Sequence, residues 1–132
     1  MNGCYTYFNV SGEFDPEDVS AALGLEPFRA WKSSDLRRDG KPYGFSNASF
    51  CRCDEYDFDI NVMLRKTLAK LTDKIEILNA LRERTDATFE LRAVPSVYVN
   101  ESTPALGLDL DIIDFCHATR TSVDIDMYVF NE

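Results

Sequence analysis

The chain has 132 residues, of which 45% are hydrophobic and 28% are charged, and these values predict one soluble domain spanning residues 1–132. No apolar run approaches the roughly 20 residues of a membrane-spanning helix and the N-terminus lacks a signal-peptide pattern, so we expect a cytoplasmic protein without membrane contacts. The formal net charge of −9 disfavours nucleic acid as a partner and favours a basic protein.

The first two predicted elements are a strand and a short helix. Residues 4–10 are rich in aromatic and β-branched side chains, which is typical of a strand. Asp15 is a suitable N-cap for a helix over residues 16–23, and Pro16 suits its first position. Gly24 supplies the left-handed residue that ends such a helix.

The middle of the chain predicts a hairpin and then helices. Residues 27–33 and 45–52 alternate like strands and are separated by a polar loop with an Asp39-Gly40 turn. Apolar residues then recur with helical spacing over residues 59–84. Asp73 and Glu76 have the spacing of a capping box, so we expect a kink or a new helix near Thr72.

The last third predicts a strand, a helix and a strand. Residues 87–99 have strand character, and Pro95 predicts an interruption at an edge or a bulge. Residues 108–118 fit either a strand or a helix, and we favour the helix. In the final strand, Asp124, Asp126 and Tyr128 are expected to face water. The alternating positions, expected to be buried, are Val123, Ile125, Met127 and Val129.

The predicted order is therefore β-α-β-β-α-β-α-β. It begins with the ferredoxin-like β-α-β-β-α-β order and adds a further helix and strand. A mainly antiparallel sheet with helices packed on one face buries these patterns, so the predicted class is α+β.

One segment resembles a known family. Leu23-Gly24-Leu25-Glu26-Pro27, then Arg29-Ala30-Trp31 and Asp35, are similar to the central motif of a bacterial domain-of-unknown-function family, number forty-two seventy-nine. Ser34 and Phe45 stand where that family usually has glycine and tryptophan. The resemblance covers most of the chain and implies its fold, and it implies no catalytic or binding residue.

Two interpretations of the only tryptophan follow from its surroundings. Arg29 and Trp31 begin the single basic segment and could bind an anion or a ring, since arginine offers a bidentate fork and tryptophan a stacking face. Arg37, Arg38 and Lys41 would add positive charge. Alternatively, Trp31 packs against a helix end and Arg29 pairs with an acid.

Metal sites have weaker support. Cys51 and Cys53 with Cys116 and His117 are zinc-ligand types, but a single residue between two cysteines does not match the usual spacing of structural zinc sites. The acidic cluster of Asp109, Asp111, Asp114, Asp124 and Asp126 lacks the spacing of a calcium-binding loop. We therefore expect no metal, no cofactor and reduced cysteines.

We predict a non-enzymatic module that binds another protein, with an immunity-type inhibitor of a basic toxin as its most concrete form. Its expected partner surface consists of Asp109, Asp111, Asp124, Asp126 and Tyr128. Two alternatives remain: a small-ligand or anion sensor that uses Arg29, Trp31 and the basic loop 37–41, and a thiol or metal enzyme.

Overall fold

A computed structural model describes residues 1–131, which form six strands and four helices. In chain order these are β1 (Gly3–Gly12), α1 (Pro16–Leu23), β2 (Arg29–Trp31), β3 (Ser46–Cys53), α2 (Ile60–Leu68), α3 (Ile75–Thr85), β4 (Thr88–Tyr98), α4 (Leu110–Thr119), β5 (Ser122–Ile125) and β6 (Tyr128–Phe130). The predicted α+β class is confirmed. The predicted order gains one helix, and its last strand is divided into two.

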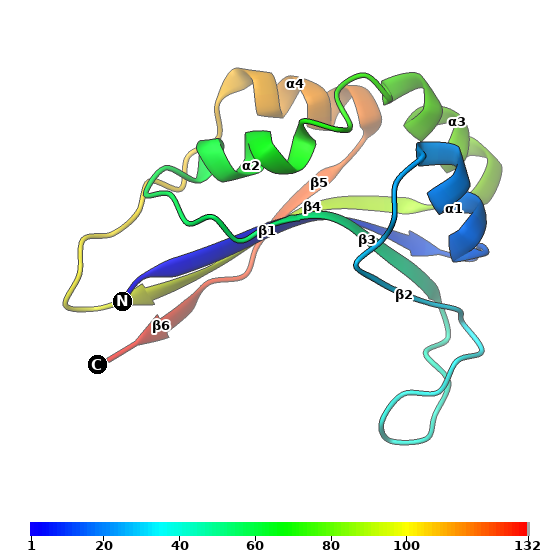
Figure 1. The fold of residues 1–132 in the computed structure, drawn as a ribbon, viewed down its shortest axis with the longest axis horizontal. Helices are drawn as coiled ribbons and strands as arrows, with labels where there is room; N and C mark the ends of the chain where they lie inside the picture. Colours follow the sequence, from blue (N-terminus) through cyan, green and yellow to red (C-terminus); the bar gives the residue numbers. More distant parts are fainter. Residues whose placement is uncertain (132) are drawn as a thin grey trace.

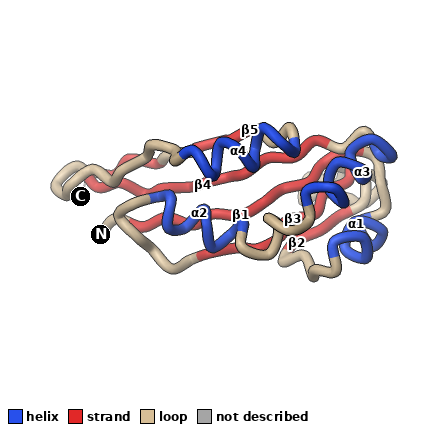
Figure 2. Tube along the Cα trace, turned by 90° about the horizontal axis from the view of Figure 1, so that it is seen from above, coloured by secondary structure: helices blue, strands red, loops and turns tan. Residues whose placement is uncertain are grey.

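All the strands described join one sheet in the order β2-β3-β1-β4, and β5 and β6 follow one another along the outer side of β4. The first four strands pair antiparallel, whereas β5 and β6 run parallel to β4. The helices lie on one face of the sheet (Figure 1). Seen from above, α2 and α4 cover the end near the termini, and α1 and α3 cover the other end (Figure 2). The opposite face is left open.

The core fills the space between the sheet and the helices. Phe8, Phe50 and Leu91 from three adjacent strands are fully buried against Leu64 and Leu78 from the helices. Each such side chain stabilises the fold by about 1.5–3 kcal/mol through burial of apolar surface. Alternation along the same strands sends every second side chain to the open face.

The first helix has the predicted ends. The carboxylate of Asp15 accepts a hydrogen bond from the backbone N–H of Glu17 at 3.0 Å, which satisfies one of the free donors at the helix start. Gly24 adopts a left-handed φ of 65°, and its N–H donates to Ser20 O. The helix therefore begins and ends where its sequence indicates.

The predicted break in the long helical region is confirmed, but its predicted cap is wrong. The chain forms α2 and α3 with a turn between them. Lys74, rather than Asp73, is the N-cap of α3, and it makes no capping hydrogen bond through its side chain. Asp73 instead contacts the Lys74 ammonium at 3.4 Å. A helix is also confirmed at the segment 108–118, where α4 spans Leu110–Thr119. Over the described residues every helix is too short or too polar to cross a bilayer.

Pro95 does not interrupt β4, so the interruption predicted there is wrong. Pro95 stays in register with Cys4 of β1. Ala93 O accepts a 2.9 Å hydrogen bond from Asp126 N on the outer side of β4. Residues two apart on a strand direct their backbone groups to the same side, so the Pro95 nitrogen faces this outer edge and donates nothing there. The outer strand divides into β5 and β6 at this place.

The division also changes the burial predicted for the last strand. Val123 is half-buried against the core, but Ile125 is 37% exposed, Met127 48% and Val129 60%. The prediction that all four are buried is wrong because β5 and β6 form the rim of the sheet, where little lies above the outer side chains. Alternation predicts which side chains share a face, but it does not predict how far the helices extend over that face. Here the helices cover Val123 and leave the later positions exposed.

Candidate binding surface

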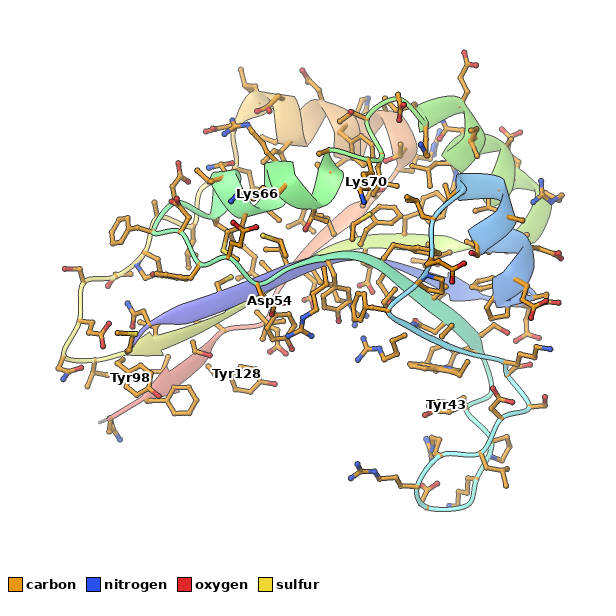
Figure 3. All side chains as sticks on the ribbon, viewed as in Figure 1. Tyr43, Asp54, Lys66, Lys70, Tyr98 and Tyr128 are labelled. Atoms are coloured by element: carbon orange, nitrogen blue, oxygen red, sulfur yellow. The ribbon has the colours of Figure 1, made fainter. Side chains whose placement is uncertain are left out.

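The open face of the sheet carries a group of aromatic and arginine side chains (Figure 3). Since Thr6 and Phe8 face the helices, alternation directs Tyr5 and Tyr7 to the open face. We call the group the aromatic–arginine platform. It consists of Tyr5, Tyr7, Phe28, Arg29, Trp31, Arg52 and Arg92.

A bulge in β3 places Arg52 in the platform. Cys51 and Arg52 together oppose the single residue Tyr7 of β1. Cys51 adopts a left-handed φ of 59°, as the first residue of such a bulge does. Strict alternation from the buried Phe50 would have directed Arg52 toward the core. With the extra residue, its guanidinium lies 3.9 Å from the centroid of the Tyr5 ring.

The hydroxyl of Tyr7 joins two arginines from opposite sides. It accepts hydrogen bonds from Arg29 Nη2 at 3.3 Å and from Arg92 Nη1 at 3.1 Å. The Tyr7 ring is only 5% exposed and packs edge-on against Phe28, with 5.4 Å between centroids. Because the oxygen is the acceptor in both contacts, its own hydrogen remains to be donated to a third group.

Aromatic rings surround the exposed guanidinium of Arg29. Its central carbon lies 5.5 Å from the centroid of Tyr7, 5.7 Å from Phe28 and 5.8 Å from Trp31. These distances are within the range of cation–π attraction. Arg29 Nη2 also approaches Ser49 Oγ at 3.5 Å. The guanidinium is thus held over the sheet by rings and hydroxyls.

The three platform arginines differ in their acidic partners. Arg52 pairs with Asp54 at 2.9 Å, and this hydrogen bond raises the pKa of Arg52. Arg92 pairs with Glu90 at 2.5 Å; burial opposes its charge, yet its hydrogen bonds keep the pKa of Arg92 above its usual value. Arg29 has no carboxylate within ion-pair distance among residues 1–131. Its charge is therefore available to an external anion.

A ring of buried polar side chains supports Arg29 from below. Ser49 Oγ donates to Asn9 Oδ1 at 2.7 Å, and Asn9 Nδ2 donates to Asn47 Oδ1 at 2.9 Å. Asn47 Nδ2 closes the ring by donating to Ser49 Oγ at 3.2 Å. All three side chains are buried, and a fully satisfied buried network is rigid. The ring fixes the position of the hydroxyl that Arg29 approaches.

Trp31 packs against the β2–β3 loop rather than against a helix end. Its ring stacks on Tyr43 with 4.3 Å between centroids and meets Phe45 edge-on at 5.7 Å. The indole N–H donates to Phe45 O at 3.0 Å. One face of the indole is therefore occupied by Tyr43, and Trp31 forms a wall of the platform as well as an anchor for the loop.

The basic loop extends away from the sheet (Figure 1). Arg37 pairs with Asp39 at 2.6 Å, and Arg37 N donates to Lys41 O across the tight turn. Arg38 and Lys41 are exposed. Over the described residues no hydrogen bond or ion pair links Arg37, Arg38 or Lys41 to Arg29. The structure joins Arg29 and Trp31 in the platform and leaves the loop bases outside it.

The acidic residues expected to form one partner surface fall into two groups. Asp109 and Asp111 lie at the start of α4, where both pair with Arg65 of α2, at 2.5 and 2.8 Å. The hydrogen bond from Arg65 holds the pKa of Asp111 below its usual value. These two carboxylates therefore hold helices together and are partly neutralised.

The second acidic group lies at the outer edge of the sheet. Asp124 of β5 is in register with Arg92 of β4. Tyr128 Oη donates to Asp126 Oδ2 at 3.2 Å, and this hydrogen bond raises the pKa of Tyr128. All three residues of the group, Asp124, Asp126 and Tyr128, are exposed. The single surface expected from the sequence is thus divided between the helix layer and the sheet edge.

The four cysteines are free thiols. Burial raises the pKa of Cys4 and of Cys116 to about 11, so both thiols are protonated at neutral pH and are weak nucleophiles. Burial also raises the pKa of Cys51. In the part of the chain described, no three His, Cys, Asp or Glu side chains are grouped in a way that would hold a metal ion.

One family model matches almost the whole chain. Residues 2–130 match the model of the family described as Domain of unknown function (DUF4279). The chain belongs to this family. The resemblance indicated by its central motif is confirmed, while no curated protein and no solved structure matches the chain.

In this DUF4279 chain the central motif also supplies three of the platform residues. Residues 24–35 supply Phe28, Arg29 and Trp31 from β2 and the turn before it. The remaining members come from β1, β3 and β4. The arrangement offers a guanidinium without an acidic partner among residues 1–131, a tyrosine hydroxyl and aromatic surface on an open face, which are the groups that bind oxyanions attached to rings.

Proposed function

We propose that this chain is a non-enzymatic binding module whose aromatic–arginine platform binds a small ligand that carries a carboxylate or phosphate group. The observation that supports the proposal is Arg29. Its guanidinium is exposed, surrounded by three rings and without an acidic partner among the described residues. A guanidinium donates two parallel hydrogen bonds to an oxyanion, and the neighbouring rings offer contact area to a flat group.

The platform is organised before a ligand arrives. Tyr7 and Ser49 are buried and hold Arg29 Nη2 from two sides, at 3.3 and 3.5 Å. Arg92 reaches the same Tyr7 hydroxyl and adds positive charge beside it. Ordering a long side chain in advance lowers the entropy cost of binding. The remaining Tyr7 hydrogen is available to the ligand as a further donor.

Fluorescence of Trp31, the only tryptophan, provides the test. The protein is titrated with phenyl phosphate, with benzoate and with inorganic phosphate, and dissociation constants are checked by calorimetry. We expect the two ring-bearing anions to bind and inorganic phosphate to bind more weakly. Arg29→Met removes a charge-assisted contact worth about 1.5–3 kcal/mol, so the affinity falls roughly tenfold to a hundredfold.

Arg37→Met is the matched control because it removes the same charge from a residue outside the platform. It should change the affinity less than about twofold. If both variants lose affinity equally, the effect is one of net charge and the platform is not the site. Absence of any binding by the wild-type protein to the ring-bearing anions contradicts the proposal outright.

A second candidate function, a module that binds a basic protein, is supported by the outer edge of the sheet. Asp124 and Asp126 alternate there with exposed apolar residues, and neither pairs with a base among residues 1–131. The exposed apolar residues of this edge are Ile125, Met127, Val129 and Phe130. An edge strand with apolar and acidic side chains suits an added strand from a basic partner, and an immunity-type inhibitor of a basic toxin would use it in this way.

The matched pairs of aspartates distinguish this candidate from a general charge effect. With a partner isolated by pull-down, substitution of Asp124 and Asp126 by asparagine should slow association, and the difference should shrink as salt rises. Substitution of Asp109 and Asp111 changes the net charge equally on the helix layer. Equal slowing by both double variants would contradict the edge as the contact surface.

A further inference from the structure

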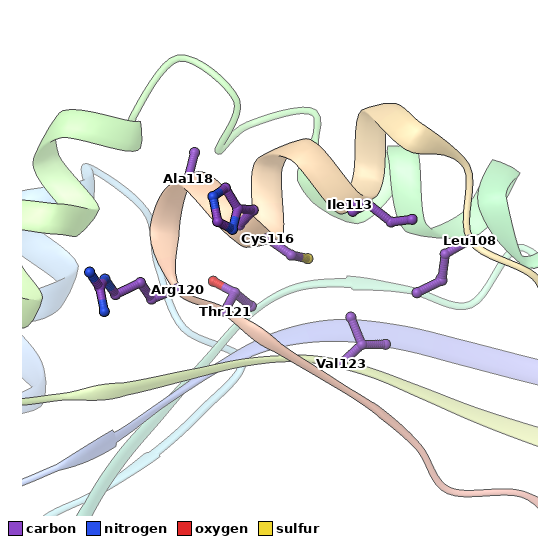
Figure 4. Close-up of a pocket in the computed structure, with 8 residues that line it drawn as sticks. Leu108, Ile113, Cys116, Ala118, Arg120, Thr121 and Val123 are labelled. Atoms are coloured by element: carbon purple, nitrogen blue, oxygen red, sulfur yellow. The ribbon is translucent and has the colours of Figure 1, made fainter.

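A groove of about 700 Å³ lies between α4 and β5, on the helix side of the sheet (Figure 4). Its size is in the range of ligand sites. The platform occupies the open face, so the groove is a separate place on the molecule. Leu108, Ile113 and Val123 contribute its apolar surface, and Arg120 and His117 contribute its basic groups.

The basic groups lie at one end of the groove. His117 is in the last turn of α4, and Arg120 follows the helix as its C-cap residue. In Figure 4 the Arg120 guanidinium and the Leu108 side chain lie at opposite ends. Over residues 1–131 neither the His117 ring nor the Arg120 guanidinium takes part in a hydrogen bond or ion pair. Among the described residues, those that line the groove include no carboxylate.

Two backbone carbonyls at this end of α4 accept hydrogen bonds from side chains other than Arg120. Thr119 O accepts a hydrogen bond from Arg82 Nη1 at 2.8 Å, and Ala118 O accepts one from Asn79 Nδ2 at 3.1 Å. The exposed carbonyls of a helix end usually attract nearby cations. Here Arg82 and Asn79 bind these two carbonyls, so the donors of the Arg120 guanidinium are available to a group in the groove.

The other end of the groove is apolar and uncharged. Leu108 and Val123 are half-buried against the core, and Ile113 is 43% exposed. The Cys116 thiol between them and the basic end is protonated at neutral pH, because burial raises its pKa. The groove therefore changes from basic to apolar along its length, which is complementary to an amphiphilic acid with a negative head and an apolar chain.

We propose that this groove binds an amphiphilic monocarboxylate, with the carboxylate at Arg120 and His117 and the hydrocarbon chain along Leu108, Ile113 and Val123. A second groove of about 600 Å³ beside α1 provides a contrast within the same molecule. It contains Glu17 and Glu26 and no basic residue. The two grooves are similar in size, so charge is what makes only the α4–β5 groove suitable for a carboxylate.

Arg120 offers an unusually clean test because it has a left-handed φ of 56°. Glycine adopts this conformation more easily than arginine does, so Arg120→Gly removes the guanidinium without harming the fold. Binding of sodium octanoate is followed by calorimetry and by chemical-shift changes of the Val123 and Ile113 methyl groups. Octylamine serves as the control of opposite charge, and acetate as the control without a chain.

We expect octanoate to bind in the groove and octylamine and acetate to bind at least about tenfold more weakly. Arg120→Gly should lose about tenfold in octanoate affinity while its melting temperature stays equal or rises. Arg38→Met, which removes a positive charge from the exposed loop outside both sites, should bind octanoate normally, so the loss in Arg120→Gly is not an effect of net charge. The proposal is overturned if Arg120→Gly binds octanoate as well as the wild type does, if octylamine binds equally, or if the shifts appear at Met127 and Phe130 instead.

Discussion

Arg29 Nη2 lies 3.3 Å from Tyr7 Oη, although these residues belong to strands that are separated by β3. Neighbouring strands lie about 4.8 Å apart, so the Arg29 and Tyr7 side chains together bridge two strand spacings across the open face. Arg92 reaches the same oxygen from β4, on the other side of β1. The Tyr7 hydroxyl therefore ties side chains from both flanks of the sheet to its central strand.

Removal of this hydroxyl should loosen the platform without unfolding the protein. Tyr7→Phe keeps the buried ring and deletes the acceptor of two hydrogen bonds. Because Arg29 and Arg92 can turn to water, we expect a cost of only about 1 kcal/mol in the free energy of unfolding by urea. Platform ligands should bind at least about fivefold more weakly. Unchanged affinity together with unchanged stability would show that the hydroxyl does not position Arg29.

Burial at the sheet edge can be tested by two truncations on neighbouring strands. Leu91 of β4 is fully buried and pairs with Val123 of β5. Ile125, two positions after Val123 on β5, is 37% exposed. Leu91→Ala should cost about 2–5 kcal/mol in the free energy of unfolding. Ile125→Ala should cost about 1 kcal/mol or less, as surface substitutions do. Equal costs would indicate that β5 is covered in solution.

The Cys116 thiol should make stability depend on alkaline pH. Its pKa rises from an ordinary 9.0 to about 11 on folding, so the unfolded thiol ionises first as pH increases. The folded state is then disfavoured progressively from about pH 9 to about pH 11, and the effect is absent below that window. Cys116→Ala has no such group. The free energy of unfolding of the wild type should therefore fall relative to that of Cys116→Ala across the window; a constant difference would contradict the raised pKa.

The contact between Arg65 and Asp111 should stabilise the packing of α2 against α4 except in acid. The pKa of Asp111 is lowered from 3.8, chiefly by the hydrogen bond from Arg65. Its contribution is complete above the ordinary pKa and is lost as pH falls through the lowered one. The melting temperature of Asp111→Asn should thus lie below that of the wild type near pH 6 and approach it near about pH 2. A difference in melting temperature that stays constant from about pH 6 to about pH 2 would contradict this role of the Arg65 contact.

The indole N–H of Trp31 should hold the β2–β3 loop in place. Trp31→Phe keeps a ring against Tyr43 and loses the hydrogen bond to Phe45 O. We expect local stability of the loop to fall by roughly 0.5–1.5 kcal/mol. Hydrogen exchange should therefore accelerate at Gly44 N, which donates to Ser33 O, while exchange in β1 is unchanged. Acceleration throughout the sheet would mean that Trp31 supports the whole fold.

The sequence by itself determined the local elements and the family. Asp15, Pro16 and Gly24 define the first helix through backbone chemistry that acts over a few residues. The aromatic and β-branched run of β1 and the Asp39-Gly40 turn are equally local. Arg29 and Trp31 could be singled out because they open the one basic segment of an acidic chain, and both lie in the platform.

Only the tertiary structure decided which distant residues meet. Alternation along a strand places Tyr7 on the face opposite Phe8, but nothing along the chain links Tyr7 to Arg92, 85 residues away. Arg52 reaches the platform through a bulge at Cys51, which breaks the alternation that sequence reasoning relies on.

The acidic residues illustrate the same limit. Asp109 and Asp111 are close in sequence to Asp124 and Asp126. Yet the first pair lies in the helix layer, where it binds Arg65, and the second pair lies at the edge of the sheet, at β5 and just after it. Sequence spacing fixes contacts only within an element. Pairing between elements depends on sheet order and helix packing, which arise from burial of the whole apolar surface at once.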